Sequence, residues 1–310
     1  IKNVAELADL YKNNESAKKI LAAAIHLEGV ARHASVHACG IVLTKEPLTE
    51  YLPLQRAPQD PNIIVSQFEM HAVEDLGLLK MDLLGLRNLT IIENTTRLVQ
   101  ELRGEKVDIS SLPLTDKKTF ELLQAGETIG VFQLESAGMT RYLKELKPTE
   151  LEDIIAMVSL YRPGPMELIP DYIARKHGKK PVAYLHPKLE PVLKNTYGIM
   201  IYQEQLMMAA RVLAGLTLSE ADVLRKAVGK KDRRLLQEQK EKLIAGCIKN
   251  GVAKDIAEKF WSLIEPFDRY GFNRSHAASY ALIAYETAYL KTHFPVEFMT
   301  ALLSAELQGI

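Results

Sequence analysis

The sequence contains few cysteines and no long apolar run. Only Cys39 and Cys247 occur among 310 residues, too few for a disulfide framework and too widely spaced for a zinc-finger pattern. No stretch approaches the roughly 18 apolar residues that a membrane helix needs, and no signal-like segment opens the chain. These absences favour a reduced, cytoplasmic setting without a membrane partner.

Neither sign of charge is in excess. The 39 basic and 39 acidic residues cancel to a formal net charge of zero, so any surface that attracts nucleic acid has to be local. With 47% hydrophobic and 25% charged residues, the composition excludes disordered and collagen-like classes. The length predicts roughly two domains, and the start at Ile1 indicates part of a longer protein.

Hydrophobic periodicity divides the chain into three stretches. Apolar residues recur at three- and four-residue steps over 4–30 with an interruption at Asn13 and Asn14, which predicts two amphipathic helices. Short β-rich runs at 40–43, 63–68 and 76–83, separated by proline and glycine, predict a small sheet. From about residue 88 the helical period persists, without a fixed repeat. We therefore predict an α+β, mostly α, protein.

Capping residues predict several helix boundaries. Thr115 or Asp116 starts a helix that stops at Gly126, and Thr149 with Glu152 forms a T-x-x-E capping box for a helix over 151–160. A weaker box at 219–222 precedes a helix-prone stretch to residue 249. Breaks are expected at 163–165, 178–181, 229 and 250–251.

Lys80 and Asp82 are charged residues in an otherwise apolar run. In a strand both side chains point to the same face. Two interpretations remain open: a structural surface or edge ion pair, or a metal-binding carboxylate beside a phosphate-steering ammonium, as two-metal phosphoryl transfer requires. That chemistry needs further carboxylates, and because the chain has no D-x-D motif they would lie elsewhere.

Basic residues concentrate in one segment. Between Arg225 and Lys242 there are eight basic and three acidic residues, and Gly229 would allow close backbone approach of an anion. A phosphate-binding patch and a solvated helix face are both consistent with this composition.

A polar cluster precedes a helix of small and apolar residues near the C-terminus. Asn273 or Ser275 is the expected N-cap, which would leave Arg274 and His276 beside free backbone N–H groups suited to an anion. A capping role alone is the alternative for Asn273 and Ser275.

Two histidines form another candidate group. His33 and His37 are four residues apart with Cys39 nearby, a set that could bind a metal ion, but the sequence offers no further ligand in range.

Seven segments, in this order, resemble the alpha subunit of bacterial DNA polymerase III, the C-family replicative polymerase. They are V-H-A-C-G (36–40), K-M-D-L-L-G-L-R (80–87), G-V-F-Q-L-E-S (130–136), Y-R-P-G-P-M (161–166), Y-Q-E-Q (202–205), R-K-A-V-G-K-K (225–231) and F-N-R-S-H (272–276). The resemblance covers essentially the whole chain. It implies the end of a helical thumb over 1–37, the C-terminal part of a polymerase-beta-like nucleotidyltransferase palm over 38–87, and incomplete helical fingers over 88–310.

The same resemblance implies roles for individual residues. Asp82 would be one of three catalytic aspartates that hold two Mg²⁺ ions, with the other two upstream in a D-x-D motif, and Lys80 would lie beside the phosphates of the incoming nucleotide or the primer end. The nucleotide-binding positions would be Arg225, Lys226, Lys230, Lys231, Asn273, Arg274, Ser275 and His276. Met81 and Cys39 depart from the family pattern, where an aromatic residue and glycine are common.

The function implied is part of a template-directed DNA polymerase that adds dNTPs to a primer 3′-hydroxyl and releases pyrophosphate. Activity is expected of the longer protein and not of this chain alone. Primer-template DNA and dNTPs would be bound, and the sliding clamp, the proofreading exonuclease subunit and the clamp loader would be protein partners. The alternative is a non-catalytic helical module that binds nucleic acid through 225–242, independently of Mg²⁺ and Asp82.

Overall fold

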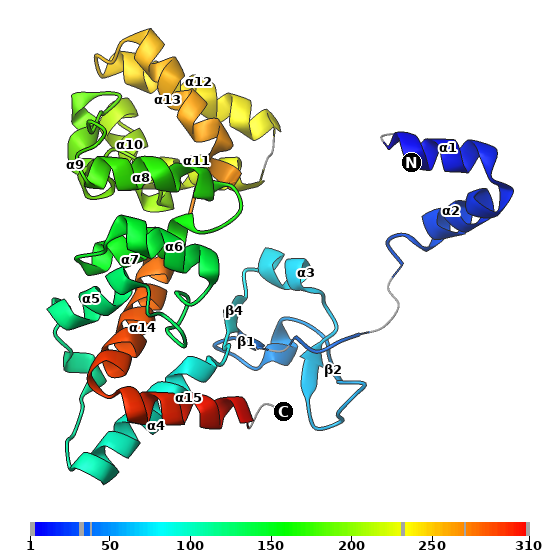
Figure 1. Cartoon of the computed structure of the whole chain (residues 1–310). Helices are drawn as coiled ribbons and strands as arrows, with labels where there is room; N and C mark the ends of the chain where they lie inside the picture. The colour runs from blue at the N-terminus through cyan, green and yellow to red at the C-terminus, as the bar shows by residue number, and fades with distance from the viewer. Residues whose placement is uncertain (1–3, 31–33, 38, 231–232, 270, 308–310) are drawn as a thin grey trace. The chain divides into compact units, whose positions relative to one another are not determined.

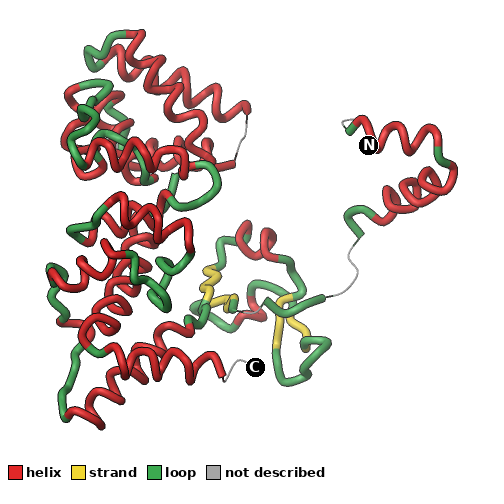
Figure 2. The backbone as a smooth tube through the Cα atoms, viewed as in Figure 1, coloured by secondary structure: helices red, strands yellow, loops and turns green. Residues whose placement is uncertain are grey.

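The computed structural model describes residues 4–30, 34–37, 39–230, 233–269 and 271–307. The chain divides into two compact units, 1–85 and 86–310 (Figure 1). Helices dominate and strands are few and short (Figure 2), which confirms the α+β, mostly α class. None of the described helices is both long and apolar enough to cross a membrane.

Unit 1 begins with the two expected helices, α1 (Ala5–Asn13) and α2 (Glu15–Leu27). Asn14 separates them, and its side chain caps α2 by accepting a hydrogen bond from the Ala17 N–H at 3.0 Å. Neither helix contains a buried residue, and apolar side chains such as Ile20 and Leu27 are 69% and 70% exposed. These helices therefore contribute no closed core within their unit.

The strands form two separate antiparallel pairs instead of one small sheet. β1 (Gly40–Leu43) pairs with β4 (Leu79–Asp82), in a register that places Gly40 opposite Asp82. β2 (Leu54–Arg56) pairs with β3 (Ile64–Ser66). The sequence did not predict β2, because it is only three residues long and directly follows Pro53. The short helix α3 (Met70–Asp75), capped by the Glu69 carboxylate, was also missed.

Unit 2 is helical. Its α-helices are α4 (Arg87–Arg103), α5 (Lys117–Ala125), α6 (Ala137–Leu146), α7 (Leu151–Leu160), α8 (Ile169–Lys176), α9 (Glu190–Leu193), α10 (Gln203–Ala214), α11 (Leu218–Lys230), α12 (Arg233–Lys249), α13 (Lys254–Ile264), α14 (Arg274–His293) and α15 (Pro295–Leu307). Short 3₁₀ turns at Ile109–Ser111, Pro165–Leu168, Pro187–Leu189, Lys194–Thr196 and Glu265–Arg269 join some of them.

Helix α14 contributes to two of the three hydrophobic clusters that the described residues of unit 2 form. It contacts α4, α5, α7 and α15 (Figure 1). Its buried face carries small side chains, which allow close approach of the neighbouring helices: Ala277, Ala281, Ala284 and Ala288. The first cluster surrounds this face, the second lies among α9–α13, and the third joins α4 to α15 and the end of α14.

Several predicted boundaries are confirmed and others are corrected. Helix α5 is capped by Asp116 and ends at Gly126 in the left-handed conformation. The box at Thr149 and Glu152 is wrong, because Thr149 bonds to the Asp153 carboxylate instead.

Two predictions for α11 are also wrong. The capping box near its start is formed by Thr217 and Glu220, two residues earlier than expected, because the Thr217 hydroxyl and the Glu220 carboxylate reach each other's backbone N–H groups. Gly229 is a residue of α11 instead of a break.

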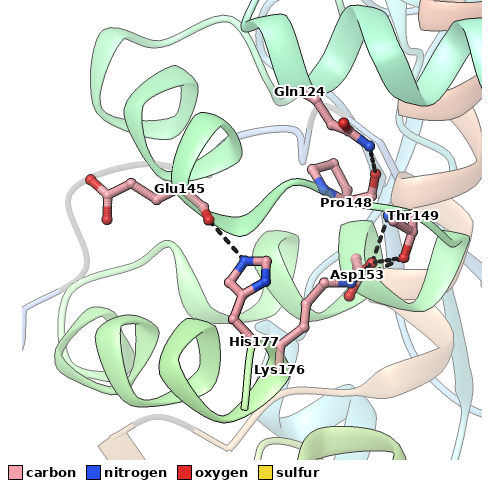
Figure 3. A network of polar contacts seen from close by, with 7 residues as sticks. All are labelled: Gln124, Glu145, Pro148, Thr149, Asp153, Lys176 and His177. Carbon is pink, nitrogen blue, oxygen red and sulfur yellow. Dashed lines mark hydrogen bonds and ion pairs between the residues drawn. The ribbon is translucent and has the colours of Figure 1, made fainter. Parts of the chain in front are cut away.

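A buried polar network ties α7 to the loop before it and to α8 (Figure 3). Asp153 on α7 accepts hydrogen bonds from the Thr149 N–H and the Lys176 ammonium. Nearby, His177 contacts the carbonyl oxygen of Glu145 at 3.0 Å. Since the Asp153 and Lys176 side chains are only 1% and 9% exposed, the two charges compensate each other inside the fold.

Candidate functional site

The first group of predicted site residues lies on a face of the β1–β4 pair. The Lys80 ammonium donates to both carboxylate oxygens of Asp82, at 2.8 and 3.0 Å, which confirms that the two side chains share a face. This hydrogen bond lowers the pKa of Asp82 and raises the pKa of Lys80. The Asp82 side chain is 51% exposed and that of Lys80 only 16%. The carboxylate is therefore ionised, held in place and still accessible to a ligand.

The backbone of β1 leaves room for this pair. Gly40 lies opposite Asp82, and a Cβ atom there would come within 3.0 Å of the Lys80 side chain and 3.1 Å of an Asp82 carboxylate oxygen. A side chain at position 40 would therefore crowd the ion pair and the His37 ring.

His37 and Cys39 lie beside Asp82. One ligand atom each from His37, Cys39 and Asp82 fall within 4.8 Å of one another. The Nδ1 atom of His37 accepts a hydrogen bond from the Gly40 N–H at 2.8 Å and lies 3.6 Å from the Cys39 sulfur. His33, the other histidine of the predicted group, falls outside the described residues.

The fit of these groups to magnesium is partial. Mg²⁺ prefers oxygen ligands in octahedral geometry, and in this cluster only Asp82 offers a carboxylate. The ligand type at Asp82 is therefore suitable, but the number of carboxylates in this cluster is too small for a pair of ions.

The second group of predicted site residues lies on α11. Arg225 and Lys226 both bind the carboxylate of Asp222, at 2.8 and 2.9 Å. Hydrogen bonds from these two cations, first from Lys226 and then from Arg225, lower the pKa of Asp222. The predicted Lys231 lies outside the described residues, as does the side chain of Lys230.

Acidic partners offset other cations of the 225–242 segment as well. Lys242 pairs with Glu220 at 2.8 Å, and Arg234 pairs with Glu238 at 3.3 Å. Because Asp222 and Glu220 lie outside the 225–242 segment, they reduce its local excess of positive charge below what the composition of the segment indicates.

The third group lies at the start of α14. Asn273 is the N-cap, since its side-chain oxygen accepts from the His276 N–H at 2.8 Å, while Ser275 donates its hydroxyl to the same oxygen. The Arg274 N–H bonds to the carboxylate of Glu204, at 3.0 Å to the nearer oxygen. The backbone N–H groups of Arg274 and His276 are therefore already hydrogen-bonded. The expectation of free N–H groups at this helix start is wrong for these two.

The start of α10 connects the second and third groups. Gln203 accepts from Arg225 at 3.4 Å, and its backbone N–H bonds to the Phe272 carbonyl at 2.9 Å. Glu204 holds the Arg274 backbone, and the Arg274 guanidinium pairs with Glu152 of α7 at 2.6 Å. The structure therefore places Arg225 and Arg274 around one short segment, although 49 positions separate them in the sequence.

Aromatic rings line the start of α14. The rings of Phe272 and His276 are 5.5 Å apart, and those of His276 and Tyr280 are 4.2 Å apart. The Arg162 guanidinium lies 4.0 Å from the Phe272 ring centre, and burial lowers the pKa of Arg162. The Y-R-P-G-P-M segment that carries Arg162 thus contacts the predicted nucleotide-binding segment.

Sequence reasoning missed the acidic partners of the predicted basic residues. Asp222 precedes Arg225 by three positions and Lys226 by four, a spacing that brings side chains together on a helix and could have been found. Glu152 and Glu204 are distant from Arg274 in the sequence, and no local signal connects them.

Comparison with known proteins covers both units. Residues 88–251 match the family model described as the bacterial DNA polymerase III alpha subunit finger domain, and residues 1–85 match the bacterial DNA polymerase III alpha NTPase domain. Among similar proteins, the DNA polymerase III subunit alpha of Thermus aquaticus is 52% identical over 99% of this chain and 25% of its own length. That of Bacillus subtilis is 50% identical over 93% of this chain and 26% of its own length.

These matches agree in family and in extent. The chain spans about a quarter of the length of the curated relatives that it matches. The finger-domain model alone covers more than half of the chain, within the helical unit that carries Arg225 and Arg274. The chain therefore belongs to the bacterial DNA polymerase III alpha subunit family.

Proposed function

We propose that the longer protein is a template-directed replicative DNA polymerase, and that this chain supplies one catalytic carboxylate and part of the nucleotide-binding surface. The reaction joins a dNTP to the primer 3′-hydroxyl and releases pyrophosphate. The observation that carries this proposal is the accessible Asp82 carboxylate, ionised and held by Lys80 on an open face of β4.

Asp82 is the residue of this chain that would hold Mg²⁺. Its oxygen ligands suit this ion, while the remaining carboxylates of a two-ion site would come from a D-x-D motif, which this chain does not contain. Bound Mg²⁺ would supply charge neutralisation for the phosphates. Lys80 orients the Asp82 carboxylate, and its ammonium is the group that would meet a phosphate oxygen at this site.

The start of α14 and the adjoining face of α11 would bind the triphosphate. Arg225 and Lys226 on α11 and Arg274 on α14 supply positive charge, and their carboxylate partners hold them in defined positions before the nucleotide arrives. The remaining residues proposed for this surface are Lys230, Lys231, Asn273, Ser275 and His276. A triphosphate would have to share or replace Asp222 and Glu152 as the partner of these cations.

Partners follow from the same proposal. Primer-template DNA and dNTPs are the substrates, and the sliding clamp, the proofreading exonuclease subunit and the clamp loader are expected protein partners of the longer protein. Base pairing, and not a base-reading motif, would provide sequence fidelity. The 310-residue chain by itself should not extend primers, because it has no D-x-D motif to complete the two-ion site.

Primer extension by the longer protein tests the role of Asp82. We expect Asp82→Asn to reduce Mg²⁺-dependent extension on the order of a hundredfold or more, because the neutral amide is a poor ligand for the ion. The matched control is Asp75→Asn, an exposed carboxylate of α3 in the same unit. Thermal melting and primer-template binding should be unchanged in both variants.

Arg225→Ala tests the nucleotide-binding surface in the same assay. Loss of this cation should raise the KM for dNTPs more than it lowers kcat, since the residue binds the triphosphate in ground and transition states alike.

Normal extension by Asp82→Asn would refute the catalytic assignment and leave Lys80 and Asp82 as a structural pair. DNA binding that depends on salt but not on Mg²⁺ would then favour the non-catalytic module.

A further inference from the structure

Unit 1 brings together three side chains of the types that hold Zn²⁺ in proteins. A histidine ring nitrogen, a cysteine thiol and a carboxylate oxygen, from His37, Cys39 and Asp82, lie within 4.8 Å of one another. Ligand atoms around a tetrahedral Zn²⁺ are about 3.5 Å apart, given bond lengths of about 2.0–2.3 Å. The three ligand atoms would therefore have to come about 1 Å closer to one another to share one ion.

The backbone holds the two segments in place. Strand pairing sets Gly40 opposite Asp82, and the Leu83 N–H donates to the Cys39 carbonyl oxygen at 2.8 Å. His37 is fixed by the hydrogen bond from the Gly40 N–H to its Nδ1 atom. The β1–β4 register thus brings Asp82 next to the segment just before β1, and the hydrogen bond from Gly40 positions His37 within that segment.

The ligand set selects the class of cation. Thiolate and imidazole ligands favour Zn²⁺ over Mg²⁺, which prefers oxygen. The sequence could not reveal this set, because Asp82 is 43 positions from Cys39. Cys39 supplies the soft ligand of the set.

Existing contacts compete with a cation at this place. The Lys80 ammonium occupies both oxygens of Asp82, and the Gly40 N–H occupies Nδ1 of His37. Zn²⁺ would displace the ammonium, which sits on a long flexible side chain, and would need Nδ1 released or the other ring nitrogen turned inward. Occupation should therefore be reversible.

We propose that His37, Cys39 and Asp82 form a three-ligand Zn²⁺ site, with water in the fourth position. Binding converts the Cys39 thiol to a zinc-bound thiolate and releases one proton to solvent. One consequence rests on the proposed function: Zn²⁺ at this site withdraws Asp82 from catalysis and inhibits the polymerase.

Cobalt binding to the 310-residue chain tests the site directly, since Co²⁺ replaces Zn²⁺ and gives a thiolate-to-metal charge-transfer absorption. We expect one equivalent to produce this band in the wild type and in Cys247→Ala, because Cys247 is buried in α12. Cys39→Ser should lose the band, and Asp82→Asn and His37→Gln should weaken cobalt affinity at least about tenfold. Circular dichroism checks that each variant keeps its helices.

Three results would overturn the site: no band in the wild type, a band that survives Cys39→Ser, or unchanged cobalt affinity in Asp82→Asn. Inhibition is measured separately, as the Zn²⁺ dependence of primer extension by the longer protein, with each variant normalised to its own zinc-free rate. Cys39→Ser should shift the inhibitory Zn²⁺ concentration upward at least about tenfold. Equal inhibition of wild type and Cys39→Ser would refute the consequence for catalysis, even where cobalt binding by the chain supports the site.

Discussion

At the scale of single residues, buried charge is tolerated in unit 2 where a partner and further hydrogen bonds compensate it. Asp153 is fully buried, and the Lys176 ammonium and the Thr149 N–H satisfy one of its oxygens. Its other oxygen, Oδ1, has no hydrogen-bond partner among the described residues. The carboxylate thus depends strongly on Lys176.

Removal of the lysine should therefore be costly. We expect Lys176→Met to lower the free energy of unfolding by about 3 kcal/mol, because an unpaired carboxylate is left in the interior. Lys180→Met is the matched control, since Lys180 pairs with Asp171 at 2.7 Å with both side chains about half exposed. It should change the free energy of unfolding by less than about 1 kcal/mol. Urea unfolding measures both, and equal losses would contradict the argument.

At the scale of elements, two helical glycines have opposite roles although both lie in helix-favouring sequence. Gly246 on α12 lies against α10, and an added Cβ would be 2.5 Å from the Ala214 carbonyl oxygen. Gly229 on α11 has open space around the position of a Cβ. Helix propensity therefore decides the effect of substitution at Gly229, whereas packing decides it at Gly246.

Alanine substitutions at these glycines test the distinction. Gly229→Ala should raise the free energy of unfolding by about 0.5–1 kcal/mol, the usual preference of a helix for alanine over glycine. Gly246→Ala should lower it by about 1–3 kcal/mol, because the clash is with backbone that cannot move aside. Thermal melting of both variants is sufficient, and stabilisation by Gly246→Ala would show that α10 and α12 can separate.

The start of α11 depends on a carboxylate that makes three contacts. Glu220 accepts from the Thr217 N–H and hydroxyl, both at 2.8 Å, and pairs with Lys242 of α12. These interactions, led by the Lys242 hydrogen bond, lower the pKa of Glu220 from 4.5 to about 2. The cap thus joins two helices as well as starting one.

Because folding lowers the pKa of Glu220, acid should reduce the stability that this residue contributes. The contribution of Glu220 is fully present above about pH 4.5 and is lost as pH falls through its folded pKa of about 2. Glu220→Gln should therefore melt at a lower temperature than wild type near pH 6, and the difference should shrink toward pH 2. Glu101→Gln, which removes an exposed carboxylate on α4, serves as a control for net charge. A difference in melting temperature that does not vary with pH would rule out this role.

At the scale of the whole molecule, burial is unequally divided. Unit 1 buries only Leu52, Ala57 and Val73 among its described apolar residues, whereas all three hydrophobic clusters lie in unit 2. A bidentate contact of Arg103 with the buried Glu297, at 2.7 Å for both bonds, further ties α4 to α15 in unit 2.

Unit 2 should consequently fold alone and unit 1 should not. We expect residues 86–310 to keep a helical circular dichroism spectrum and a cooperative thermal transition close to that of the whole chain. Residues 1–85 should melt without cooperativity, since so little apolar surface is buried. A sharp independent transition in 1–85 would contradict this division, and loss of the transition in 86–310 would show that unit 2 needs unit 1.

Much of the architecture could be predicted from the sequence because it depends on local chemistry. Periodicity predicted α1, α2 and the helical run, and Asp116 and Gly126 predicted the ends of α5, because caps act within a few residues. The shared face of Lys80 and Asp82 followed from strand alternation. The named thumb, palm and fingers divisions, and the roles of the site residues, stay predictions.

Tertiary structure alone decided which distant residues meet. The predicted capping box of Thr149 and Glu152 does not form. Asp153, which pairs with Lys176 of α8, accepts the hydrogen bond from the Thr149 N–H that was expected for Glu152. Glu152 pairs instead with Arg274, 122 positions away, and the β1–β4 register brings Asp82 to the segment before β1 that carries His37 and Cys39. Local sequence determined helices, caps and strand faces, since those depend on neighbours in the chain. Pairing of charges and ligands across the fold depends on packing that no local pattern encodes.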